Sequence, residues 1–145
     1  MLLSPSELKA WKNDEINWWD KFSHLMAKSW EMTPRLNKIL RKNMIDDFSN
    51  YLFKEDGKLL DVGCGNGWIS KIFAEKGMNV VGVDFSITQI NEANSLNKDD
   101  LGIHNRITFV RGDITKLETL EIGRDFDSVI VSALLHHLPF QEKQL

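Results

Sequence analysis

Short apolar runs alternate with helical periodicity along residues 57–145, a pattern that predicts an α/β fold. Four runs of strand length are rich in apolar residues, and they lie at 58–62, 80–83, 107–110 and 126–132. Helical spacing begins at Trp68 after the first run, and a capping box at residues 86–89 begins another helix after the second. The charged connection 114–125 is expected to be irregular.

Residues 1–56 show helical periodicity only, so we expect an N-terminal helical extension before a core at residues 57–145. A capping box at Ser4–Glu7 starts one helix, and Thr33 with Pro34 starts a second that runs to about Phe53. One face of the first helix is rich in aromatic residues and contains Leu8, Trp11, Glu15, Trp18, Trp19, Phe22, Leu25 and Met26. This face either packs the helix onto the core or forms a lid over a ligand, and the two roles are compatible.

A glycine-rich turn follows the first predicted strand. Gly63, Gly65 and Gly67 alternate along it, and a helix follows at once. Glycine lets the backbone turn tightly and lets a ligand approach the main chain, while free N–H groups at the helix start face that ligand. The pattern favours a ligand cradle, with a tight turn that binds nothing as the alternative.

Polar residues stand at the ends of the predicted strands. Asp84 ends the second strand, 21 positions after Gly63, where a carboxylate could accept hydrogen bonds from ribose hydroxyls. Asp113 follows the third strand and Ser132 ends the fourth. Because open α/β sheets bind ligands outside the carboxyl ends of their strands, these residues are expected to meet at one site. Asp61, inside an apolar run, needs a hydrogen-bond partner if it is buried.

Composition and charge exclude several classes of protein. The formal net charge of -3 gives no reason to expect a nucleic-acid partner. The single cysteine, Cys64, excludes an intramolecular disulfide and agrees with a reducing compartment. No apolar run approaches the roughly 20 residues of a membrane-spanning helix, and none has the length of a signal-peptide core. We therefore expect a cytoplasmic protein without a membrane partner.

Four segments in order, LLDVGCGNG, VVGVDFS, FVRGDITKL and FDSVIVSALLHHLP, are spread over roughly residues 58–139. Together they resemble the cofactor motifs of class I S-adenosylmethionine-dependent methyltransferases that act on small molecules. The resemblance implies a Rossmann-like fold, a mostly parallel seven-stranded sheet with flanking helices. It also implies methyl transfer from S-adenosylmethionine to a nitrogen, oxygen or carbon nucleophile by in-line displacement, with S-adenosylhomocysteine as product.

The sequence supplies about four of those seven strands. We therefore expect either an N-terminal fragment of a longer methyltransferase or a short form that completes its sheet by pairing with another chain. An unpaired final strand favours association, so a homo-oligomer through the exposed sheet edge is possible.

The resemblance also implies roles for individual cofactor-binding residues. The amino-acid end of the cofactor is expected near Asp61 and the backbone of the three glycines, with Cys64 as a small packed residue among them. Asp61 could equally be a structural acceptor for the N–H groups of the turn, and a mixed role is favoured. Asp84 is expected at the ribose, with Phe85 against the adenine.

Asp113 is expected at the adenine amino group, with Ile114 offering an apolar face or its backbone N–H. The alternative for Asp113 is a cap of the following turn. Gln89 is expected to serve the helix cap, although its side chain could face the adenosine. Ser132 is expected close to the transferred methyl group.

His136 and His137 follow the fourth strand, where a neutral imidazole could take the proton that a nucleophile loses on methylation. Only one of the pair can face inward, and His137 is chosen. Metal-dependent relatives carry acidic residues around this segment, and residues 132–135 contain none, so no metal site is expected.

Two other functions compete with methyl transfer. A nicotinamide-dependent oxidoreductase uses the same strand, turn and acid, but normally with G-x-G-x-x-G, whereas this chain has G-x-G-x-G. A non-catalytic binding or assembly module, or an inactive fragment, would keep the nucleotide fold without its substrate half.

Overall fold

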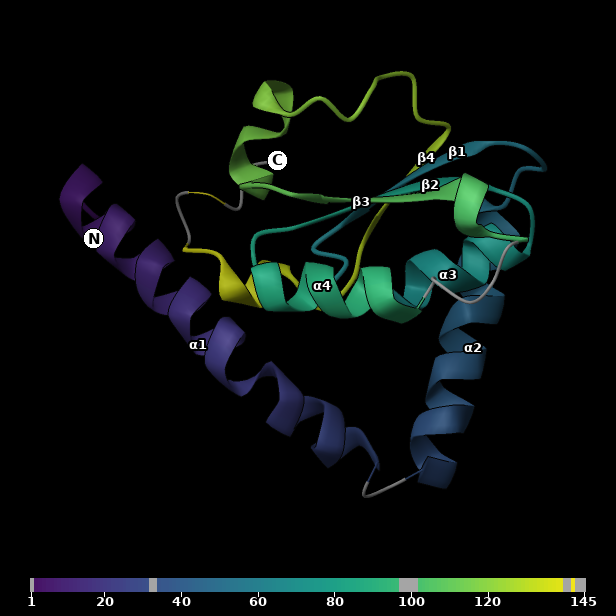
Figure 1. Ribbon diagram of the computed structural model, residues 1–145, viewed down its shortest axis with the longest axis horizontal. Coiled ribbons are helices and arrows are strands. Elements are labelled where there is room, and N and C mark those ends of the chain that lie inside the picture. The colour runs from purple at the N-terminus through teal and green to yellow at the C-terminus, as the bar shows by residue number, and fades with distance from the viewer. Residues whose placement is uncertain (1, 32–33, 97–101, 140–141, 143–145) are drawn as a thin grey trace.

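The computed structural model describes residues 2–31, 34–96, 102–139 and 142 (Figure 1). Its helices are α1 (Pro5–Glu31), α2 (Pro34–Leu52), α3 (Trp68–Glu75) and α4 (Ile87–Leu96). Its strands are β1 (Lys58–Val62), β2 (Asn79–Asp84), β3 (Ile107–Arg111) and β4 (Ser128–Val131). The described residues also form three short 3-10 helices, η1 (His104–Arg106), η2 (Ile114–Thr119) and η3 (Leu135–His137).

The described strands form one parallel sheet in the order β3-β2-β1-β4. This confirms the predicted α/β class with a Rossmann-like arrangement. The chain runs outward from β1 to β2 and β3, and then returns to place β4 on the other side of β1. A reversal of this kind creates a crevice at the carboxyl ends of the two strands on which it turns, here β1 and β4.

Successive residues of a strand point to opposite faces of the sheet, and both faces bury apolar side chains. On one face Leu59 and Val80 pack with Phe73 and Met78, and α2 adds Ile45. On the other face, Leu60, Val62 and Val83 pack with Ile114, Leu134 and Leu138. Figure 1 shows α3 and α4 on the first side of the sheet and the connection from β3 to β4 on the second.

The N-terminal capping box forms as predicted. The backbone N–H of Ser4 donates to Glu7 Oε2 at 2.8 Å, and Ser4 Oγ accepts the N–H of Glu7 at 3.4 Å. The expected cap at Thr33 and the expected end of the fourth helix at 97–101 lie outside the described residues.

The connection between β3 and β4 was expected to be irregular, and its first half instead forms short 3-10 turns that are joined at a kink at Lys116. Residues 114–119 form η2, because the Asp113 carboxylate caps them by accepting the N–H of Thr115 at 3.0 Å. Leu117 and Leu120 then pack on the buried face of the sheet. The last strand is also shorter than predicted, since Phe126 packs on that face before β4 begins at Ser128.

Phe73 carries the largest fully buried side chain of the described core, so truncating it tests the packing of α3 on the sheet. We expect Phe73→Ala to lower the free energy of unfolding by about 3–5 kcal/mol, through lost burial and the cavity left behind. The matched control is Tyr51→Ala, because Tyr51 is 87% exposed and its truncation should change stability by about 0.5 kcal/mol or less. Urea unfolding followed by circular dichroism measures both, and equal losses in the two variants would contradict the packing described.

Candidate functional site

The glycine turn after β1 is fastened to the end of β2. The N–H groups of Gly63 and Cys64 both donate to the carbonyl of Val83, at 2.8 and 3.0 Å. Gly67 has a φ of +75°, and a Cβ there would lie 2.4 Å from Phe109 Cζ. Only glycine combines this positive φ with the absence of a side chain that would clash with Phe109. The N–H groups of Gly63, Cys64, Gly65 and Gly67 are all bonded within the protein, so the turn itself is braced by its own hydrogen bonds, and the free N–H groups expected at the start of the following helix stay a prediction.

Asp61 is a buried carboxyl group beneath this turn. Its side chain is 1% exposed and accepts the hydroxyl of Ser70 at 2.6 Å, which joins β1 to the first turn of α3. Burial raises the pKa of Asp61 to about 6, a shift that the Ser70 hydrogen bonds oppose and the nearby charge of Asp84 reinforces. A structural acceptor role is therefore present, and the group also lines the cavity described below.

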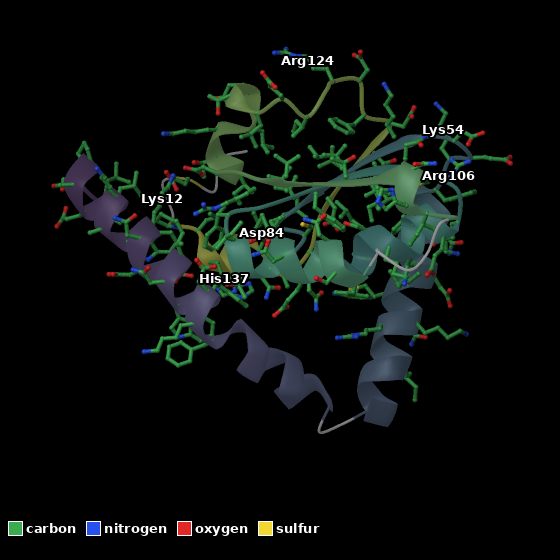
Figure 2. All side chains as sticks on the ribbon, viewed as in Figure 1. Lys12, Lys54, Asp84, Arg106, Arg124 and His137 are labelled. Atoms are coloured by element: carbon green, nitrogen blue, oxygen red, sulfur yellow. The ribbon has the colours of Figure 1, made fainter. Side chains whose placement is uncertain are left out.

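Asp84 joins the glycine turn to the start of α4. Its Oδ2 accepts the N–H of Gly65 at 2.9 Å, and its Oδ1 accepts the N–H of Ser86 at 2.9 Å. Burial raises the pKa of Asp84, and the charge of Asp20 adds to that effect, while the backbone N–H groups oppose it. Each carboxylate oxygen has two lone pairs, so the group can accept further hydrogen bonds from a ligand. Figure 2 shows Asp84 between the sheet and α4.

The expectation that Gln89 serves the helix cap is corrected by the structure. Ser86 Oγ does accept the N–H of Gln89 at 3.2 Å, but the Gln89 side chain donates to Glu92 at 3.3 Å. The Ser86 N–H that Gln89 would have capped is bonded instead to Asp84, because a carboxylate is a stronger acceptor than an amide. Gln89 thus turns its side chain toward Gly65, where Oε1 would be 3.2 Å from an added Cβ.

A cavity of about 510 Å³ opens at the crevice between the ends of β1 and β4. Most of the sequence-predicted site residues line it, namely Asp61, Gly63, Cys64, Gly65, Asp84, Phe85, Gln89, Ser132, His136 and His137. Burial raises the pKa of the Cys64 thiol, which makes it a packed wall residue and a poor nucleophile. Gly67 is absent from the lining, since it is buried against Phe109.

Asp113 and Ile114 line a second cavity of about 350 Å³, between α1 and the ends of β2 and β3. Phe85, Leu134 and His137 line both cavities, so the two adjoin each other. Burial tends to raise the pKa of Asp113, but hydrogen bonds from Thr115 and Lys12 outweigh it and hold the pKa below its ordinary value. The capping alternative for Asp113 is thus realised, and its carboxylate faces the second cavity as well.

Helix α1 is fastened over these cavities at two points. Lys12 Nζ donates to Asp113 Oδ2 at 2.9 Å and to Thr115 Oγ1 at 2.8 Å. Eight residues further along, Asp20 Oδ1 accepts the N–H of Thr88 at 3.3 Å and the hydroxyl of Ser86. These residues were not identified from the sequence, because no local spacing relates them to partners about 65 to 103 residues away.

The segment after β4 carries the two histidines. His136 is exposed, whereas His137 is partly buried under α1. His137 Nδ1 lies 3.6 Å from Glu15 Oε2, and the ring of Trp19 meets the His137 ring edge to face at 5.0 Å. Burial lowers the pKa of His137, the neighbouring His136 lowers it further, and Glu15 acts in the opposite direction. Glu15 and Trp19 belong to the aromatic-rich face of the N-terminal helix.

The described part of the chain shows neither a metal-ion cluster nor a membrane-spanning helix. No cluster of three or more His, Cys, Asp or Glu side chains there has the geometry to hold a metal ion. Among the described helices, none combines the length and apolar character needed to cross a membrane.

The chain is similar to proteins of known family. Residues 53–145 match the family model described as a methyltransferase domain. A ubiquinone biosynthesis O-methyltransferase of Actinobacillus pleuropneumoniae serotype 7 (strain AP76) is 31% identical over 126 residues, which cover 83% of this chain and 53% of the relative. The protein of the same name from Hahella chejuensis (strain KCTC 2396) is 31% identical over 134 residues, 92% of this chain and 51% of the relative. The chain thus spans about half the length of the curated relatives it matches.

Among solved structures, the fold resembles magnesium protoporphyrin IX methyltransferase from Synechocystis PCC 6803, crystallised with bound SAM. The TM-score is 0.71 at 21% identity, over 92% of this chain and 66% of the other. At 21% identity, this structural similarity supports the fold alone.

The raised pKa of Asp61 predicts a pH-dependent stability. The folded state holds this proton up to about pH 6, compared with the ordinary pKa of 3.8. The contribution of Asp61 to the free energy of unfolding is therefore fully present below about pH 4 and is lost as the pH rises through about 6. Above about pH 4, the free energy of unfolding of the wild type should therefore fall by up to about 3 kcal/mol more than that of Asp61→Asn, which cannot ionise at this position.

Urea unfolding at pH 4, 5, 6 and 7 measures this difference. The exposed acid Glu118, changed to Gln, is the control and should keep the wild-type slope. Parallel pH profiles for wild type and Asp61→Asn would show that Asp61 is ionised normally in the folded state.

Proposed function

The chain belongs to the methyltransferase domain family, in its class I S-adenosylmethionine-dependent branch, and on that premise we propose that the whole protein transfers a methyl group to a small molecule. The observation that carries the proposal is the cavity at the reversal of the sheet, where the glycine turn meets two buried carboxyl groups, Asp61 and Asp84. Crevices at this place in an α/β sheet are the usual ligand sites of such folds.

The cavity fits S-adenosylmethionine in charge and in shape. That molecule carries a sulfonium and an ammonium cation beside one carboxylate. The cavity wall contains Asp61, Asp84 and Glu92 against one guanidinium, Arg41, so it favours a ligand with net positive charge. Its volume of about 510 Å³ lies in the range of small-molecule sites. Gly63 and Gly65 both line the wall with positive φ, and an added Cβ would lie 2.8 Å from Leu134 Cδ1 and 3.2 Å from Gln89 Oε1, so the wall requires residues without side chains there.

We assign parts of the ligand to residues by chemistry and position. Asp84 is assigned to the ribose hydroxyls, since both its oxygens keep a lone pair after bonding the backbone. The amino-acid end is assigned to the wall formed by Asp61 and the glycine turn, with Arg41 as the cation for its carboxylate. Arg41 is held in place over the Trp68 ring at 4.7 Å.

The adenine is assigned to the second cavity, which adjoins the first at Phe85. Phe85 and Ile114 offer it apolar surfaces, and Asp113 Oδ2 keeps an acceptor site beside its bond to Lys12. Ser132, at the end of β4, is assigned to the neighbourhood of the methyl group.

S-adenosylmethionine is consumed in each turnover and supplies the activated methyl group. The residues of the chain hold the two reactants in line and exclude water, which together supply much of the rate in such transfers. The two curated relatives described above are O-methyltransferases, which favours an oxygen nucleophile over nitrogen or carbon.

We further propose that residues 1–56 act as a lid on the core at 57–145. Support comes from α1, whose Lys12 and Asp20 bond to the core on either side of the second cavity. A cytoplasmic location and association through the edge of β4 stay predictions, and so does the absence of a nucleic-acid or membrane partner.

Calorimetric titration with S-adenosylmethionine and S-adenosylhomocysteine tests this proposal. We expect Asp84→Asn to weaken binding by roughly 10- to 150-fold, the effect of losing hydrogen bonds to a charged acceptor. Asp47→Asn is the charge-matched control, since Asp47 is exposed on α2, and it should bind as the wild type does. Circular dichroism of each variant separates lost binding from lost folding.

NAD is titrated in parallel as the ligand of the competing oxidoreductase function. Binding of NAD in place of S-adenosylmethionine, or equal affinity in wild type and Asp84→Asn, would refute the assignment.

A further inference from the structure

Glu15 is a carboxylate that the cofactor assignment does not use, although it lies against the proposed site. It belongs to α1, lines the second cavity, and has its Oε2 3.6 Å from Nδ1 of His137. That distance is longer than a hydrogen bond and within the range of an ion pair. Such contacts in ligand-free enzymes often tighten when the substrate is bound.

A carboxylate beside one imidazole nitrogen determines what the other nitrogen can do. With Glu15 at Nδ1, the neutral ring is favoured with its proton on Nδ1, which leaves the lone pair on Nε2. When Nε2 takes a proton, the imidazolium that forms is stabilised by the same carboxylate. In serine hydrolases an aspartate plays the same two roles, since it orients the base histidine and stabilises the imidazolium.

The position of Glu15 is fixed by its neighbours on α1. Lys12, three residues earlier, is bonded to Asp113 and Thr115, and Trp19, four residues later, packs edge to face on the His137 ring. Residues three and four apart share one helix face, so these contacts set the register of the carboxylate against His137.

The charged and titratable groups that line the two cavities with His137 come from every surrounding element. They are Lys12 and Glu15 on α1, Arg41 on α2, Asp61 on β1, Cys64 in the glycine turn, Asp84 on β2, Glu92 on α4, Arg111 and Asp113 at the end of β3, and His136. Lys12 forms ion pairs with Asp113 and Glu142, and Arg111 Nε donates a hydrogen bond to the carbonyl of Phe85. Of these groups, Glu15 makes the ion-pair contact with the His137 ring.

We propose that Glu15 is the positioning residue of His137, holding the proton on Nδ1 so that Nε2 can take the proton of a hydroxyl acceptor. This inference rests on the proposed methyl transfer. As the acceptor O–H bond breaks, its proton goes to Nε2 and its oxygen forms a bond to the methyl carbon. The carbon–sulfur bond of the sulfonium breaks, and sulfur keeps the electron pair. The products are a methyl ether, S-adenosylhomocysteine and an imidazolium that later gives its proton to water.

The pair also selects a chemical class of acceptor. An alcohol or phenol that is neutral at physiological pH is a weak nucleophile and gains most from a positioned base. An anion such as a carboxylate needs no base and gains nothing from one. The geometry therefore points to a neutral hydroxyl compound.

Nuclear magnetic resonance of the ¹⁵N-labelled protein tests the pairing without any activity. The chain has 4 histidines, and His137→Asn assigns the relevant ring. Because Glu15 opposes the lowering of the His137 pKa, we expect Glu15→Gln to lower that pKa further. The same variant should move the neutral ring toward the form protonated on Nε2, and Glu15→Asp should restore part of both effects.

Asp14→Asn is the matched control, because Asp14 is an exposed acid on the same helix turn. Its His137 signals should equal those of the wild type. Unchanged pKa and tautomer in Glu15→Gln would overturn the proposal.

Methyl transfer to two phenols tests the acceptor class. One has the acidity of tyrosine, with a pKa of about 10, and the other is a nitrophenol that is ionised at neutral pH. Glu15→Gln should lower kcat for the first by about tenfold or more and leave the second within about twofold. Equal losses for both phenols would assign Glu15 a structural role only and overturn the inference. Transfer to neither phenol would refute the hydroxyl acceptor, while the resonance shifts would still decide the pairing of Glu15 with His137.

Discussion

The bonds to the buried carboxylate of Asp84 are the interaction on which the rest of the site depends. One oxygen holds Gly65 in the turn after β1, and the other holds Ser86 at the start of α4. Ser86 in turn donates its hydroxyl to Asp20 of α1. A buried charge without such partners would cost several kcal/mol, so the carboxylate and its neighbours must be placed together. The glycine turn, β2, α4 and α1 are therefore held by a single connected set of hydrogen bonds.

The same arrangement leaves the site electrostatically unfavourable without a ligand. Asp61 and Asp84 both have raised pKa values, first because they are buried and also because charged neighbours repel them. A ligand that brings positive charge into the cavity relieves this repulsion and gains affinity from it. Perturbed acids in a crevice are a common mark of functional sites for this reason. Some stability of the free protein is thus given up for binding, as is usual where function requires buried charge.

Local patterns predicted the strands, the glycine turn and the N-terminal helix cap well, since each of these depends on residues close in sequence. Alternation of apolar runs placed all four strands, and the spacing of Gly63 and Asp84 placed both on one cavity wall. The predicted cap role of the Gln89 side chain was wrong because the capping rule considers only the helix itself. At this helix the carboxylate of Asp84, which precedes the cap, competes for the Ser86 N–H and takes it. The pairing of Glu15 with His137 could not be predicted, because it depends on how α1 lies across the sheet.

The position of α1 changes how the N-terminal segment should be understood. Its aromatic face had two compatible interpretations, packing and covering a ligand, and the positions of Trp11 and Trp19 are compatible with both. Trp19 lines the first cavity and packs on His137, whereas Trp11 lines the second cavity. The boundary at residue 56 therefore divides the sequence but not the walls of the cavities. A ligand that contacts both walls stabilises the docking of α1, and by linkage a firmly docked α1 raises the affinity for that ligand. For a ligand of that kind, contacts of α1 that line neither cavity, such as Asp20 with Thr88, would also contribute to the binding free energy.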